Sequence, residues 1–155
     1  STPGPEMSCP RSSCSSVMLH DGRVLVICGM DNDNDILSTT EILNITIGTS
    51  SPGPDMNTAR RGASAVLLPE DGGVLVIGGI SDEINLDTTE VLDVAKNTTS
   101  AGPKIGIPRS YCAALKLPGD HILVIGGYSG YGIPESSSEI LGMPVEEGQW
   151  QKRRC

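Results

Sequence analysis

The sequence has very few aromatic residues: no Phe, one Trp and three Tyr among its 155 residues. A core built from large rings is therefore excluded, and aliphatic residues and alanine must fill it. The chain has 19 Gly and 11 Pro, which interrupt long helices and favour turns. This composition predicts an all-β chain of short strands and tight hairpins rather than a helical bundle.

Basic residues and long apolar runs are also scarce. Eleven Lys and Arg stand against 19 Asp and Glu, which gives a net charge of −8 and an isoelectric point of about 4.6. An acidic surface repels phosphate groups, which argues against nucleic-acid binding. No apolar run approaches the roughly 18 residues that a membrane span needs, so we expect none.

The cysteines and sequons give limited information on location. Five cysteines without C-x-x-C spacing argue against a structural zinc site. Two N-x-T sequons make Asn44 and Asn97 possible glycosylation sites and favour a secreted protein over a cytoplasmic one. The chain begins without an initiator Met or a signal-like segment, as expected of a processed chain or a fragment.

Internal repeats decide the fold. A short motif recurs every 49 residues, at Thr40–Leu43, Thr89–Leu92 and Ser138–Leu141. The same interval separates three arginines, Arg11, Arg60 and Arg109. An aliphatic run followed by glycine also recurs, at Val24–Ile27, Val74–Ile77 and Ile122–Ile125. Repeats of this length are typical of propeller blades.

The residue pattern within each copy of the repeat predicts four short strands. The aliphatic run is the second strand and is typical of a strand buried on both faces. The third strand surrounds the Glu-Ile/Val-Leu motif, and a weak fourth strand is expected near residues 45–50, 94–100 and 143–150. The three blades predicted in this way span about residues 11–50, 60–100 and 109–150.

The run Met56–Leu68, the double glycine Gly78-Gly79 and the later Glu90-Val91-Leu92 resemble Kelch repeats. The resemblance extends over nearly the whole chain in three copies. It implies one four-stranded antiparallel blade per repeat, arranged around a central channel with the first strand innermost. The chain departs from the family where leucine replaces the usual Tyr of the third strand, and where Cys28 replaces the first glycine.

The repeated Arg and Glu residues have two interpretations. They could form a ring of ligand-binding charges, or each could be a structural element of its own blade. A residue needed once per repeat indicates an architectural role, so we expect Arg and Glu to pair where blades meet.

Little in the sequence supports catalysis. His20 and His121 both fall in turns between first and second strands, without a Ser or Cys at triad-like spacing. The resemblance extends to copper oxidases with Kelch repeats, but Tyr111, Tyr128 and Tyr131 with two turn histidines do not assemble their metal site. We therefore predict a protein that is not an enzyme and has no cofactor.

One loop could bind calcium. Asp31, Asp33 and Asp35 alternate like the first half of a calcium-binding loop. Ile36 stands where that loop needs glycine, and Ile42 where it needs a bidentate Glu. The alternatives are a weak calcium site and a solvated acidic loop.

The cysteines of the first hairpin are not expected to form a disulfide. A turn of four residues, His20–Arg23, would pair Cys28 with Ser15 and place Cys14 on the opposite face.

Two functions remain: a module that binds a protein or glycan partner, and a structural subunit that completes a ring or filament. The loops between second and third strands vary while the strands repeat, which favours recognition. These loops and the connections between blades should share one face, opposite His20 and His121. On it we predict binding by Tyr128, Tyr131, Asp82 and Glu83 to a partner with basic groups. Three blades leave outer faces bare, so we expect either a homo-oligomer or a longer propeller.

Overall fold

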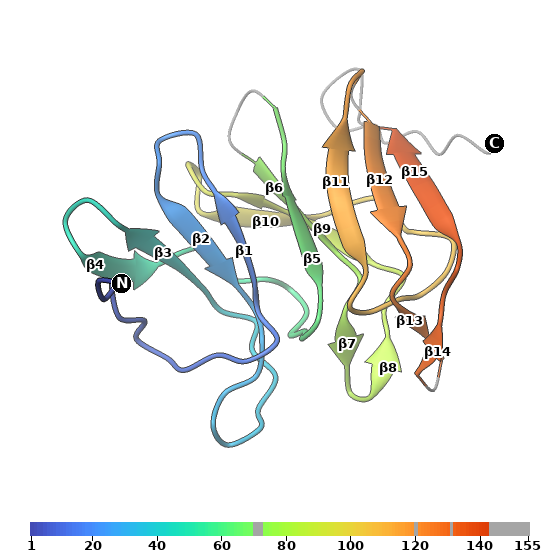
Figure 1. Cartoon of the computed structure of the whole chain (residues 1–155), viewed down its shortest axis with the longest axis horizontal. Coiled ribbons are helices and arrows are strands. Elements are labelled where there is room, and N and C mark those ends of the chain that lie inside the picture. Colours follow the sequence, from blue (N-terminus) through green and yellow to red (C-terminus); the bar gives the residue numbers. More distant parts are fainter. Residues whose placement is uncertain (70–72, 120, 131, 143–155) are drawn as a thin grey trace.

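The computed structural model describes residues 1–69, 73–119, 121–130 and 132–142. All regular secondary-structure elements in these residues are β-strands. Figure 1 shows three antiparallel sheets standing side by side in chain order. No described segment forms a helix that could cross a membrane. The predicted all-β fold of antiparallel blades is confirmed.

The sheets repeat one strand order. The first contains β1 (Ser15–Met18), β2 (Val24–Ile27), β3 (Thr40–Asn44) and β4 (Thr49–Pro52). The second contains β5 (Ser64–Leu67), β6 (Gly73–Ile77), β9 (Thr89–Asp93) and β10 (Thr98–Ala101). The third contains β11 (Ala113–Leu117), β12 (His121–Ile125) and β15 (Ser138–Gly142). The fourth strand predicted near residues 143–150 lies outside the described residues.

Two small hairpins extend from the loops that follow the aliphatic strands. One is formed by β7 (Ile80–Ser81) and β8 (Ile84–Asn85), the other by β13 (Tyr128–Ser129) and β14 (Ile133–Pro134). From the sequence we predicted only loops for these segments.

The fourth strands begin later than predicted. The side-chain oxygen of Asn44 accepts hydrogen bonds from the backbone N–H groups of Thr46 and Ile47, at 3.1 and 3.3 Å. Such side-chain bonds stabilise a turn, so residues 45–48 connect the strands and β4 starts at Thr49. Asp93 binds the N–H of Lys96 in the same way, and β10 starts at Thr98.

The turn between β1 and β2 is shorter than predicted. The Leu19 N–H donates to the Arg23 carbonyl at 2.7 Å, and Gly22 adopts a left-handed φ of 84°. Glycine commonly takes this conformation in three-residue hairpin loops. Ser15 therefore pairs with Ile27. The predicted register was therefore wrong by one residue. The observed register gives no reason to place Cys14 and Cys28 on opposite faces of the sheet. Both thiols are free.

The hydrophobic core lies between the sheets. Val74 and Val76 of β6 pack against the first sheet, whereas Leu75 and Ile77 of the same strand pack against the third. All four side chains are fully buried, and each contributes about 1.5–3 kcal/mol to stability. Burial on both faces explains why the second strands are continuous aliphatic runs.

A repeated ion pair fixes the entry to each sheet. The guanidinium groups of Arg11, Arg60 and Arg109 contact the carboxylates of Glu41, Glu90 and Glu139, at 3.0, 2.6 and 2.9 Å. Each carboxylate also accepts two backbone N–H groups from the segment that leads into its sheet. The predicted structural role of these residues is confirmed.

Backbone hydrogen bonds join adjacent sheets at equivalent positions. The Ser13 carbonyl accepts the N–H of Gly62, and the Gly62 carbonyl accepts the N–H of Tyr111. These three residues are 49 positions apart and all adopt left-handed φ values, of 51°, 62° and 51°. The first strands β1, β5 and β11 consequently lie next to one another.

Candidate interaction site on the loop face

The small hairpins and the segments that enter the first strands lie at one end of the sheets. Isolated bridges join Arg61 to Ile80 and Ser110 to Tyr128. In Figure 1 both hairpins project downward, while the β1–β2 connection lies at the top and β11 points toward the top. The predicted grouping of two-to-three loops with the connections between blades is confirmed. We call this end the loop face.

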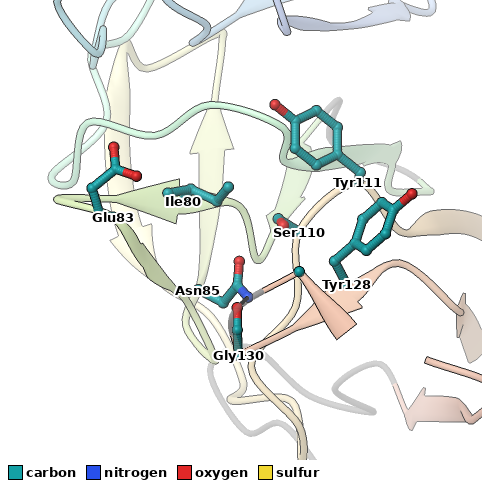
Figure 2. A pocket seen from close by; sticks show the side chains of 8 residues that line it. Ile80, Glu83, Asn85, Ser110, Tyr111, Tyr128 and Gly130 are labelled. Carbon is teal, nitrogen blue, oxygen red and sulfur yellow. Dashed lines mark hydrogen bonds between the residues drawn. The ribbon is translucent and has the colours of Figure 1, made fainter. Parts of the chain in front are cut away.

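A cavity of about 600 Å³ opens on the loop face between the second and third sheets. Figure 2 shows that its walls come from both small hairpins and from the segment that enters β11. Its lining residues are Ile80, Glu83, Asn85, Ser110, Tyr111, Tyr128, Gly130 and Gly132.

Two tyrosine rings form one wall of the cavity. The rings of Tyr111 and Tyr128 meet edge to face, with centroids 6.4 Å apart and an interplanar angle of 82°. Both side chains are about half exposed. Edge-to-face packing is a favourable arrangement of aromatic rings, and the half-exposed side chains leave part of the ring surface open to solvent.

Tyr111 is held by its neighbours in the other two sheets. Its hydroxyl donates to the Ser13 Oγ atom at 3.3 Å. Its ring lies so close to Gly62 that a Cβ atom there would stand 2.8 Å from the Cζ atom of Tyr111. Glycine at position 62 therefore makes room for the ring.

The opposite wall is polar and links the two hairpins. The side-chain amide of Asn85 donates to the Gly130 carbonyl at 2.9 Å, which ties β7–β8 to β13–β14. Glu83 lies at the tip of the first hairpin, where it and Asp82 have left-handed φ values of 63° and 46°. The Glu83 carboxylate contacts Arg61 at 3.3 Å, but its side chain is 86% exposed.

The predicted binding residues fall in different places. Tyr128 and Glu83 line the cavity, whereas Asp82 is not among its lining residues. Tyr131 lies outside the described residues. A role in binding remains a prediction for all four.

Tyr111 and Asn85 also line the cavity, and we did not predict either of them from the sequence. One signal could have found Tyr111, since it is an aromatic residue at a repeated position where the other copies have Ser13 and Gly62. Nothing in the sequence marks Asn85, because its role depends on the neighbouring hairpin.

Carboxylates dominate the loop face, and several have partners. Asp87 contacts Lys104 at 2.9 Å. Hydrogen bonds from the hydroxyls of Ser129 and Ser137 lower the pKa of Glu135. The excess of carboxylates gives this face a negative potential.

The other predicted sites lie apart from the cavity. In the acidic loop, one Asp31 oxygen accepts the N–H groups of Asp33 and Asp35, at 3.0 and 2.9 Å. No group of three metal-binding side chains occurs among the described residues; calcium binding remains a prediction. Asn44 is partly buried and Asn97 is exposed, and their glycosylation is untested.

Antiparallel sheets stacked through equivalent junctions define the chain as a set of β-propeller blades. A family model described as Kelch motif matches residues 11–57, which include the whole first sheet. This match and the repeated sheets together support the predicted resemblance to Kelch repeats. No curated protein matches the chain. Modules of this family commonly mediate protein interactions and are generally non-catalytic.

Proposed function

We propose that this chain is a protein-binding module that contacts its partner at the cavity on the loop face. The observation that carries the proposal is the half-exposed pair of Tyr111 and Tyr128 at the wall of a 600 Å³ cavity. Tyrosine provides a large contact area and a polar group at low entropic cost, and it is enriched at interaction hot spots. A cavity of this size suits side chains of a partner.

Selection from a displayed library of random peptides on the immobilised chain tests this function. Selected peptides should bind Tyr128→Ala at least about fivefold more weakly than the original chain. His20→Ala, at the opposite end, is the control and should bind normally. Peptides that still bind Tyr128→Ala but no longer bind His20→Ala would show that the partner binds the opposite end of the sheets, and the proposed site would be wrong.

A second candidate function is assembly with another copy of this chain. Leu115 and Ile125, on the outer face of the third sheet, are 43% and 40% exposed. The equivalent residues of the second sheet, Val66 and Ile77, are 6% and 0% exposed because the third sheet covers them. The third sheet therefore exposes apolar side chains at positions that are buried in the second sheet. The first sheet of a second copy would cover them, as the third sheet covers the second within one chain.

A further inference from the structure

The cavity on the loop face combines ring surface with oxygen atoms that can accept hydrogen bonds. Aromatic ring faces carry negative electrostatic potential and attract cations that approach within about 6 Å. In Figure 2, the rings of Tyr111 and Tyr128 stand on one side of the open space and Glu83 on the other. A cation placed between these walls has favourable electrostatics on both sides.

Two acceptors in the cavity retain free capacity. Arg61 contacts one oxygen of Glu83 at 3.3 Å, whereas a carboxylate offers about four acceptor positions. Exposed ion pairs of this kind are weak, so a second cation can share the carboxylate. The Asn85 amide donates through its nitrogen to Gly130, and its oxygen is directed away from Gly130 toward the open space (Figure 2).

The charge of the surrounding face selects for a basic partner. Seven carboxylates belong to the described loops of this face, and the cations that pair with them are Arg61 and Lys104. The carboxylates are Asp31, Asp33, Asp35, Asp82, Glu83, Asp87 and Glu135. This excess of negative charge attracts cationic segments and repels acidic ones.

We propose that the cavity binds an arginine side chain of the partner, stacked on one ring of the tyrosine pair and hydrogen-bonded to Glu83 and Asn85. This proposal rests on the proposed function and names the chemistry of its central contact. Arginine fits better than lysine because its planar guanidinium stacks on rings and presents several donors in a fixed geometry. The volume of about 600 Å³ also leaves room for the backbone on either side of that residue.

The first test uses small probes on the whole chain. N-acetyl-arginine amide is titrated against the ¹⁵N-labelled chain, with N-acetyl-citrulline amide as the uncharged probe of matching shape. The arginine probe should shift the resonances of Gly130, Gly132 and the Asn85 side chain, and it should bind about three- to tenfold more tightly than the citrulline probe. Equal binding of both probes, or shifts confined to other surfaces, would overturn the proposal.

Matched variants then locate the contact. Glu83→Gln and Tyr128→Ala should each weaken binding of the arginine probe by about three- to tenfold, whereas Tyr128→Phe keeps the ring and should bind nearly normally. Asp82→Asn removes a charge from the same hairpin turn without changing the cavity wall, and its effect should be smaller than that of Glu83→Gln. Equal effects of these two variants would indicate general attraction to an acidic surface and overturn the proposed contact.

The library peptides separate this inference from the proposed function. Replacing arginine by citrulline in a selected peptide should weaken its binding at least about threefold. If Tyr128-dependent peptides tolerate this replacement, the arginine contact is wrong and the protein-binding function stands. If no selected peptide depends on Tyr128, the proposed function itself fails.

Discussion

The guanidinium group of Arg60 is completely buried, and each of its N–H donors forms a hydrogen bond. Its nitrogens donate to the carbonyls of Thr58, Gly78 and Thr88, to the Thr88 hydroxyl and to Glu90. Burial of a charge is tolerated only when the charge is paired and its donors are satisfied. The need for such a site in every sheet explains why the residue recurs at a fixed interval.

Removal of one partner from this buried pair should be strongly destabilising. Glu90→Gln leaves the charge of Arg60 without its counter-ion, and we expect a loss of about 3–5 kcal/mol in the free energy of unfolding. The control is Asp21→Asn, which breaks the exposed pair between Asp21 and Arg23 and should cost less than about 1 kcal/mol. Urea denaturation measures both, and similar losses would contradict the assigned role.

The equivalent residue of the first sheet should make stability depend on pH. Burial alone would raise the pKa of Glu41, but hydrogen bonds from the Ser8 backbone, Ser50 and Arg11 outweigh it and lower the pKa from 4.5 to about 2. The folded state therefore holds the ionised form more strongly than the unfolded state does. This stabilisation is complete above about pH 4.5 and is lost as the pH falls toward about 2.

Measurement of the unfolding free energy between pH 2 and pH 6 tests this expectation. The curve for Glu41→Gln should be flatter than that of the original chain over the interval from about pH 4.5 to about pH 2. Parallel curves would show that Glu41 is not responsible for acid sensitivity.

At the scale of the elements, the glycines after the aliphatic strands control how closely neighbouring sheets approach. Gly78 has a left-handed φ of 60°, and a Cβ atom there would lie 2.2 Å from the carbonyl oxygen of Arg109. Cys28 occupies the corresponding place in the first sheet with a φ of 54°, and burial raises the pKa of its thiol to about 11. The position of Cys28 therefore accommodates a side chain, whereas the equivalent position of Gly78 does not.

Two glycine substitutions separate steric overlap from backbone strain. Gly78→Ala should destabilise the chain by about 3 kcal/mol or more, because it adds overlap with Arg109 to the strain of a left-handed residue. Gly48→Ala has the strain alone, since φ is 70° and no atom lies within 4 Å of the added Cβ, and it should cost about 1 kcal/mol. Equal midpoints in thermal unfolding would contradict this reading of the junction.

Sequence reasoning succeeded where a structural need recurs and failed where it occurs once. The aliphatic strands and the Arg–Glu pairs were predictable because three copies carry the same pattern. The length of the β1–β2 turn depends on local features such as the left-handed φ of Gly22, and the position of the Tyr111 ring depends on the absence of a side chain at Gly62. The 49-residue repeat relates Tyr111 to Gly62, but the two positions carry different residues, so the repeat does not predict their contact.

For the whole molecule, the outer face of the third sheet is the feature that bears on assembly. It exposes Leu115 and Ile125 at positions that are buried in the second sheet. Apolar residues gathered on one sheet face favour burial against a partner. The outer face of the first sheet carries Val24, whose counterpart in the second sheet, Val74, packs at a junction between sheets.

We expect the chain to self-associate in solution. Light scattering should give a mass above the 16.2 kDa of one chain, with the mass rising with concentration. Ile125→Lys should raise the dissociation constant more than about tenfold, because it places a charge in an apolar contact. Ile47→Lys is the control, since Ile47 is exposed in the turn between β3 and β4. A concentration-independent mass of one chain would rule out assembly through this face.

The hydrogen bond from Tyr111 to Ser13 spans 98 positions of the chain. The described residues that line the cavity lie between Ile80 and Gly132, so a fragment without the first sheet would still contain all of them. That fragment would lack the hydroxyl that holds the Tyr111 ring in place. A recombinant protein designed around the second and third sheets alone would therefore keep these lining residues but lose one of the contacts that position the Tyr111 ring.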